Sequence, residues 1–72
     1  MVKINKIYID RFKKTKYGYY LAIGKGILLN FNNNLEYEGY SNMYNINYKT
    51  LETKINEYIN LLISKSLLEV ED

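Results

Sequence analysis

The sequence predicts an α+β domain in which a small antiparallel meander of three or four strands precedes one C-terminal amphipathic helix packed on one sheet face. Three observations lead to this prediction. Apolar residues alternate with a period of two over much of residues 6 to 40. Clusters of glycine and asparagine interrupt that alternation at short intervals, as turns do between antiparallel neighbours. After residue 50 the apolar period becomes that of a helix.

All residues from 1 to 72 are predicted to form this single domain, because a chain of 72 residues has no room for a second core. The first predicted strand runs from Lys6 to Phe12, where side chains alternate strictly. Val2 and Ile4 fall out of that phase, which indicates either a bulge near Asn5 or a strand that begins only at Lys6. The polar residues 13 to 16 are predicted to form a turn.

The central strands are predicted over residues 17 to 23 and 27 to 31, with their apolar residues in one phase. The segment Gly24-Lys25-Gly26 favours a hairpin turn between them, although a bulge in one long strand is the alternative. Asn32-Asn33-Asn34 predicts a second turn, because asparagine tolerates the left-handed conformation and bonds its own backbone. Alternation over residues 35 to 40 then predicts a further strand.

Residues 41 to 49 have no clean period and are predicted to form a loop over the core. Thr50 is the predicted N-cap of the helix, which we expect to end near Leu67. At 100° per residue its apolar residues share one arc of roughly 140°. They are Leu51, Ile55, Tyr58, Ile59, Leu62 and Ile63. Because one helix covers one sheet face, the other face must meet water, a second subunit or a ligand.

Catalysis by this chain is not expected. The sequence contains no Cys and no His, so a Ser-His-Asp triad, a Cys-His pair or a His-based metal site cannot be built from one chain. Glu36 and Glu38, on one side of a strand, are the remaining candidates for cation binding or acid-base chemistry. A charged strand edge that discourages aggregation explains them more simply. We predict no cofactor and no metal.

Composition favours a cytoplasmic protein. The N-terminus lacks an apolar signal region, no run approaches membrane-spanning length, and small secreted domains normally carry disulfides. Asn, Ile, Lys and Tyr make up 37 of the 72 residues, as expected from an AT-rich genome. Short genes of this kind are frequent in phages and mobile elements. We therefore expect a phage-type protein in the cytoplasm of a bacterial host, without a membrane partner.

Charge is distributed unevenly along the chain. Residues 1 to 25 carry seven basic residues and one acidic residue, whereas residues 26 to 72 carry three basic and seven acidic ones. A basic hairpin rich in tyrosine suits phosphates and stacked bases. Nine of the ten basic residues are Lys, which argues against specific base reading. The candidate nucleic-acid-binding residues are Arg11, Lys13, Lys14, Lys16, Tyr17, Tyr20 and Lys25. The alternative is that these lysines only keep the domain soluble.

A second candidate surface lies on the helix. Leu61 and Leu68 are seven residues apart and project away from the predicted apolar stripe. They either contact a partner or, for Leu68 and Val70, belong to a tail that folds back. The predicted partner-binding residues are Leu61, Leu68, Tyr40 and Tyr44.

The functional prediction is a small non-enzymatic binding protein that docks on a partner protein and inhibits or modulates it. The alternative is a module that binds nucleic acid or nucleotides through the basic hairpin. Burial in so short a chain barely offsets the entropy of folding, and oligomerisation is a usual remedy. We therefore also expect a homo-oligomer.

Overall fold

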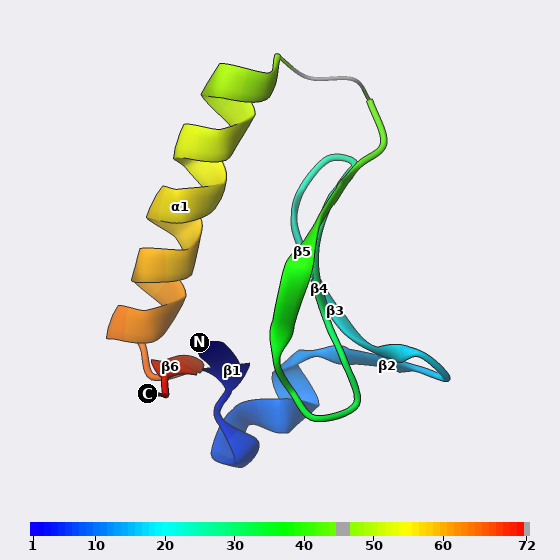
Figure 1. Ribbon diagram of the computed structural model, residues 1–72, viewed down its shortest axis with the longest axis vertical. Coiled ribbons are helices and arrows are strands. Elements are labelled where there is room, and N and C mark those ends of the chain that lie inside the picture. Colours follow the sequence, from blue (N-terminus) through cyan, green and yellow to red (C-terminus); the bar gives the residue numbers. More distant parts are fainter. Residues whose placement is uncertain (45–46, 72) are drawn as a thin grey trace.

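The computed structural model describes residues 1 to 44 and 47 to 71, and for Tyr48 its backbone only. Its strands are β1 (Val2–Ile4), β2 (Lys13–Thr15), β3 (Gly18–Gly24), β4 (Ile27–Phe31), β5 (Tyr37–Asn42) and β6 (Leu68–Val70), and its helices are the 3-10 helix η1 (Lys6–Arg11) and α1 (Tyr48–Ser64). Strands β2, β3, β4 and β5 form an antiparallel meander in that order, and β1 pairs with β6. Figure 1 shows α1 on one side of the meander. The predicted fold class is confirmed, with a second small sheet added.

The N-terminal segment departs most from the prediction. Residues 2 to 4 form β1, and the predicted strand from Lys6 to Phe12 is wrong because residues 6 to 11 form η1. Asn5 is the physical reason, since its side-chain oxygen accepts the Ile7 N–H at 3.1 Å and caps the helix. Its amide nitrogen also donates to the Ser66 carbonyl at 2.9 Å, which holds the cap against the end of the chain.

The segment predicted as a turn over residues 13 to 16 is mostly strand. β2 occupies residues 13 to 15 and the turn consists of Lys16 and Tyr17 alone. Thr15 closes it, because its hydroxyl accepts the Tyr17 N–H and donates to the Gly18 carbonyl. At Gly18, φ is +148° and a Cβ would collide with the Phe31 carbonyl. The three residues of β2 pair with the first three residues of β3, Gly18 to Tyr20.

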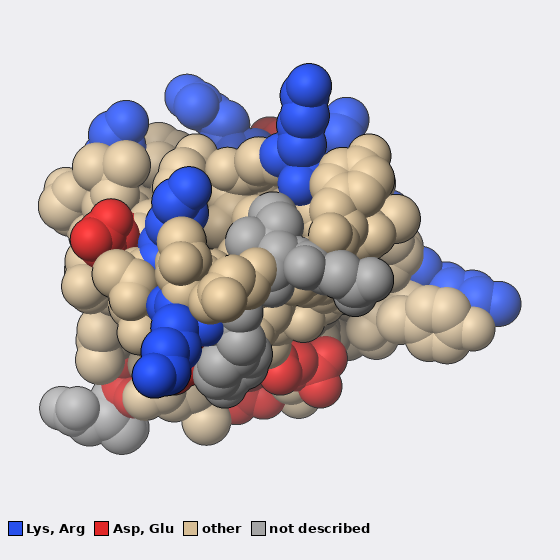
Figure 2. Space-filling model, turned by 90° about the horizontal axis from the view of Figure 1, so that it is seen from above, with Lys and Arg blue, Asp and Glu red and all other residues tan. Residues whose placement is uncertain are grey.

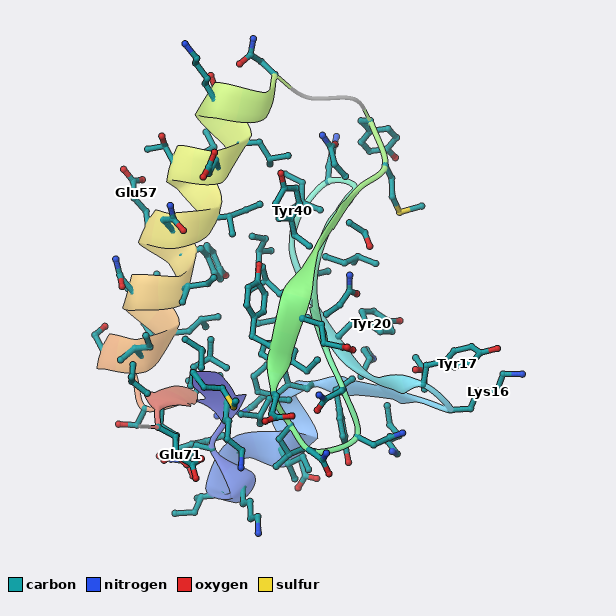
Figure 3. All side chains as sticks on the ribbon, in the orientation of Figure 1. Lys16, Tyr17, Tyr20, Tyr40, Glu57 and Glu71 are labelled. Atoms are coloured by element: carbon teal, nitrogen blue, oxygen red, sulfur yellow. The ribbon has the colours of Figure 1, made fainter. Side chains whose placement is uncertain are left out.

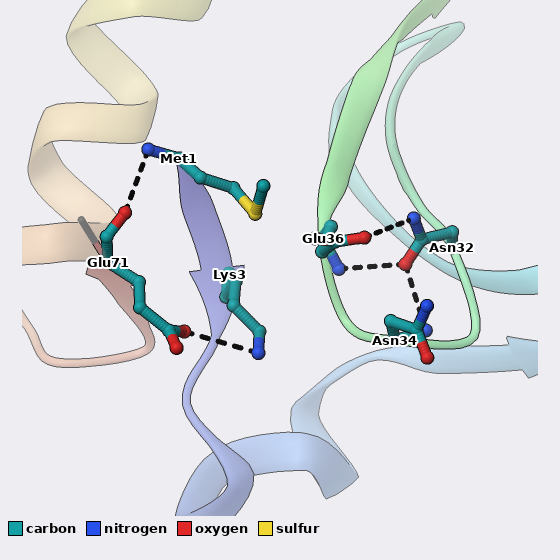
Figure 4. Close-up of polar contacts among 6 residues, drawn as sticks. All are labelled: Met1, Lys3, Asn32, Asn34, Glu36 and Glu71. Carbon is teal, nitrogen blue, oxygen red and sulfur yellow. Dashed lines mark hydrogen bonds and ion pairs between the residues drawn. The ribbon is translucent and has the colours of Figure 1, made fainter.

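The prediction of two central strands, rather than one long strand, is confirmed. They are joined by a turn at Lys25-Gly26, where Gly26 has a φ of +72°. The asparagine turn is confirmed as well, since the Asn32 side-chain oxygen accepts the N–H groups of Asn34 at 2.9 Å and Glu36 at 3.0 Å (Figure 4). The left-handed residue of this turn is not an asparagine but Leu35, at φ 70°, and its side chain is buried in the core.

β5 and α1 both extend into the segment predicted as a loop over residues 41 to 49. β5 continues to Asn42, and α1 begins at Tyr48. Thr50 is not the N-cap, because the Asn47 side chain accepts the N–H groups of Lys49 and Thr50. The predicted apolar stripe is confirmed, with Leu51, Ile55 and Leu62 buried and Tyr58, Ile59 and Ile63 half-buried.

The two ends of the described chain lie side by side. α1 stops at Ser64, earlier than predicted, and β6 pairs with β1 in the register Val2↔Val70. The Met1 ammonium donates to the Glu71 carbonyl at 3.0 Å, and Lys3 Nζ lies 3.2 Å from Glu71 Oε2 (Figure 4). The prediction of an exposed Leu68 on the helix is wrong, and its alternative, a tail that folds back, holds for this residue.

The core lies between α1 and one face of the meander. Phe31 contributes ring contacts to Phe12 and Tyr37, with centroids 5.4 and 5.6 Å apart. Burial raises the pKa of the Tyr37 phenol, and the neighbouring Tyr40 raises it further. The buried core residues are Ile4, Phe12, Ile27, Leu29, Phe31, Leu35, Leu51, Ile55, Leu62 and Leu68.

Neither of the two described helices covers the opposite face of the meander (Figure 1). Cross-strand pairs place Tyr20 beside Asn30 and Ala22 beside Leu28 on this face. Asn30 donates to the Ser41 hydroxyl at 2.8 Å. This open face is therefore a mixture of polar and apolar groups.

Candidate protein-docking groove

A mostly apolar groove of about 480 Å³ lies between α1 and the ends of β3 and β4. We call it the α1–β3 groove. α1 supplies one wall, and the strands with their connecting turn supply the other. The lining residues are Ile23, Gly24, Lys25, Ile27, Leu51, Lys54, Ile55, Glu57, Tyr58 and Leu61.

The strand wall of the groove is a free sheet edge. β2 ends its pairing opposite Tyr20, so residues 21 to 24 of β3 pair only with β4 within the described part of the chain. An edge of this kind presents unpaired N–H and C=O groups to its surroundings. Leu21 and Ile23 are half-buried on the α1 side, Ala22 is exposed, and none of the four residues is charged.

The helix wall combines the buried stripe with one exposed leucine. Leu51 and Ile55 form the floor because they are buried against the sheet. Tyr58 is half-buried. Leu61, one turn further along, is 44% exposed, so the prediction that it projects away from the core is confirmed. An exposed leucine beside apolar neighbours and a free strand edge forms a surface suited to a polypeptide.

The charges around the groove are unbalanced. Lys25 and Lys54 both line it, and Glu57 is the one acidic residue among the lining residues. The only ion pair within residues 1 to 44 and 47 to 71 joins Lys3 to Glu71, so none of the three groove charges is neutralised by a partner. Figure 3 shows Glu57 pointing outward from α1, away from the sheet. The groove therefore favours a negatively charged ligand group.

The other predicted partner-binding residues do not join Leu61 in one surface. Tyr40 points toward α1 (Figure 3) and is half-buried against the core. Leu68 is buried, with 1% of its surface exposed. Tyr44 is exposed and its ring packs on Gly26, next to the groove residue Lys25, so closely that no side chain would fit at Gly26.

The predicted nucleic-acid-binding residues divide between surfaces. Lys13 lies opposite Tyr20, which points away from α1 on the open face (Figure 3), whereas Lys14 lies opposite Tyr19 on the core side. Lys16 occupies the hairpin tip, where Figure 3 shows it projecting from the molecule. Arg11 ends η1 and is exposed. Lys25 lies beyond the far end of β3, a strand of seven residues and therefore about 20 Å long.

Two of these lysines already interact with aromatic rings of the hairpin. Lys14 Nζ lies 4.5 Å from the Tyr19 ring centroid and bonds the Asn33 side-chain oxygen at 3.1 Å. Lys16 Nζ lies 5.0 Å from the Tyr17 ring centroid. Each ammonium therefore lies over one face of its ring.

The space-filling view shows how these charges spread. In Figure 2 basic side chains lie along the upper margin, on the left of the visible face and at the tip where the β2–β3 hairpin projects, and acidic ones lie mainly along the lower margin. The two halves of the sequence differ in charge, but the basic groups do not converge on one cleft.

The carboxylates Glu36 and Glu38 do not converge either. Glu36 accepts a hydrogen bond from the Asn32 amide at 2.9 Å and lines a hollow with Lys3, whereas Glu38 lines another hollow with Tyr20. The described residues contain no group of three potential metal ligands. Among the described helices, none has the length and apolar character needed to cross a bilayer.

Sequence reasoning missed the strand wall and the lysine at the helix wall. The sequence places Ile23 on the apolar face of a strand and Ile55 and Tyr58 on the apolar stripe of the helix, and it marks Lys54 as part of no site. No local signal would have identified the groove, because its strand wall exists only where β2 ends. Comparisons with protein-family models, with curated proteins and with solved structures found no match for this chain.

Proposed function

We propose that this chain is a small non-enzymatic binding protein that docks on a partner protein through the α1–β3 groove and inhibits or modulates that partner. The single observation that carries the proposal is the apolar groove bordered by both the exposed Leu61 and a free strand edge. A polypeptide satisfies such an edge with its own backbone groups, which few small molecules do.

The distribution of the lysines supports a protein partner over nucleic acid. A backbone-binding surface needs several cations that follow one path of phosphates. Here Lys13 and Lys14 face opposite sides of the sheet, and Lys25 lies at its other end. The ammonium groups of Lys14 and Lys16 are also engaged by tyrosine rings.

The test is capture of the partner by tagged chain from host lysate, with and without nuclease treatment, followed by mass spectrometry. Leu61→Lys should lose the partner, because a charge replaces an apolar contact in the groove. Asn60→Lys is the matched control, since it adds the same charge at the neighbouring exposed position. A partner retained by Leu61→Lys would contradict the proposal. Capture that depends on nucleic acid, and is lost after nuclease, would favour the alternative function.

A further inference from the structure

We propose that the ligand of the α1–β3 groove is an extended segment of the partner, which adds a strand to β3 antiparallel to it and begins with an acidic residue. This inference rests on the proposed function and specifies the chemistry of the partner. The occupant is defined by three features of the groove, which are its free backbone, its alternating side-chain sites and its charge.

The free backbone sets the length and form of the segment. Residues 21 to 24 of β3 leave about 13 Å of strand edge free for pairing, at 3.3 Å per residue, with the register shift of the β3–β4 pair falling between Ala22 and Gly24. Their outward N–H and C=O groups are satisfied when a further strand continues the sheet. Each described strand of the meander is antiparallel to its neighbour, so an antiparallel addition continues the observed order.

The side-chain sites set the spacing of apolar residues. Successive side chains of an added strand point to opposite faces of the sheet. Every second one would therefore enter the groove, over the surface formed by Ile23, Tyr58 and Leu61. The intervening side chains would lie beside the exposed Ala22 on the open face. The segment needs apolar residues at alternate positions, not at helical spacing.

The lysines set the charge and its position. Lys25 follows the last residue of β3, and Lys54 lies in the N-terminal half of α1, which Figure 1 shows at the same end of the molecule as the β3–β4 turn. An antiparallel segment starts at this end. Its first residue is therefore Asp or Glu, followed by the alternating apolar positions.

Selection from a displayed library of random ten-residue peptides, with the immobilised chain as target, tests this motif. We expect enrichment of an acidic residue followed by apolar residues at alternate positions, and loss of binding to the Leu61→Lys chain. Apolar residues at helical spacing, or no enrichment over the Leu61→Lys chain, would overturn the inference.

The backbone contact is tested on the peptide, so protein folding is not perturbed. A selected peptide is synthesised with N-methyl groups on one or the other set of alternate residues. The set whose N–H groups face β3 should lose about tenfold or more in affinity, and the other set should retain binding. Equal effects of the two sets would exclude strand addition.

The charge contact is tested by the double substitution Lys25→Gln with Lys54→Gln. Affinity for the selected peptide should fall about fivefold, and replacing the peptide's acid by its amide should cause no further loss. Lys65→Gln, at an exposed position outside the groove, is the matched control. Independent, additive losses would place the acid elsewhere and contradict the motif.

The experiments separate this inference from the proposed function. A partner protein that needs Leu61 but presents no strand-forming peptide would leave the function standing and remove the inference. If the chain forms a dimer that Leu61→Lys converts to a monomer, the groove binds a second copy of the chain. That result would also overturn the inference. Without any Leu61-dependent partner, the proposed function itself fails.

Discussion

The two edges of the meander, β5 on one side and β3 beyond the end of β2 on the other, differ in charge. The edge formed by β5 carries the exposed carboxylate of Glu38, and its pairing with β4 contains a register shift next to Gly39, with φ +132°. An isolated antiparallel β-bridge pairs Lys3 with Glu36, the residue just before β5. The β3 edge carries no charge over residues 21 to 24, although its pairing with β4 also shifts register between Ala22 and Gly24, and β2 stops before reaching these residues.

This difference between the edges supports the proposed docking at β3. Charges and bulges discourage a foreign strand from pairing at an edge. Both edges have a register shift, but only the β5 edge also carries a charge, so we expect a further strand to pair with β3 and not with β5. The short β2 favours pairing of a further strand with β3. It leaves one side of residues 21 to 24 without a neighbouring strand, next to the apolar groove.

The largest expected effect compares a core leucine with Leu61, and it tests whether Leu61 contributes to the stability of the fold. Leu68→Ala should reduce the free energy of unfolding by about 2 to 5 kcal/mol, because it empties a fully buried site. Leu61→Ala, at a 44% exposed position, should cost less than about 1 kcal/mol. Urea unfolding followed by circular dichroism measures both. Similar losses would mean that Leu61 is part of the core and not available to a partner.

The next effect concerns how the β5 edge is held in place. Asn32→Ala removes two hydrogen bonds to backbone N–H groups and one to the Glu36 carboxylate. We expect a loss of about 1 to 3 kcal/mol, since the two bonds to Glu36 are partly buried and their groups are left unpaired. Asn33→Ala is the control, because that exposed side chain accepts only a bond from Lys14. A loss as large at Asn33 as at Asn32 would argue against the turn as the anchor of β5.

Self-association distinguishes the edges from the open face. We expect a homo-oligomer at micromolar concentration, with a second copy covering the open face near Leu28. Leu28→Lys should then lower the mass measured by light scattering by breaking an apolar contact. Glu38→Val should raise that mass, because it removes the charge from the β5 edge. A wild-type monomer that Glu38→Val leaves monomeric would contradict both expectations.

The sequence predicted what is local in this fold. The turns at Gly26 and Asn32 and the stripe of α1 follow from side chains within a few residues of each other. The β1–β6 pair joins three-residue strands from opposite ends of the chain, so no local period marks it. Leu68 was misplaced because helical spacing was extended past Ser64, and no glycine marks that end, where Ser66 takes φ 66°.

The candidate site was predictable only in part. Leu61 is identified by its position outside the stripe, which is a property of the helix alone. The groove additionally needs the end of β2, and residues 13 to 15 are too polar to indicate a strand. Their pairing with β3 depends on the two-residue turn closed by Thr15, which is a matter of hydrogen bonds and not of hydropathy.

The smallest expected effect is a pH dependence at the first residue of β5. Burial and the neighbouring Tyr40 raise the pKa of Tyr37 above its ordinary value of 10.0. Below pH 10 the phenol is protonated in both states, so its contribution to stability is fully present. As the pH rises past 10.0, the unfolded chain loses this proton first, and stability falls as the pH passes through the folded-state pKa.

Tyr37→Phe should therefore make the free energy of unfolding decline less steeply with pH above about 10. The measurement is urea unfolding at a series of pH values from 8 to 11. Tyr17→Phe is the matched control, because that side chain is 76% exposed and meets water in both states. An unchanged slope in Tyr37→Phe would mean that the phenol at the start of β5 is as well hydrated in the folded chain as in the unfolded one.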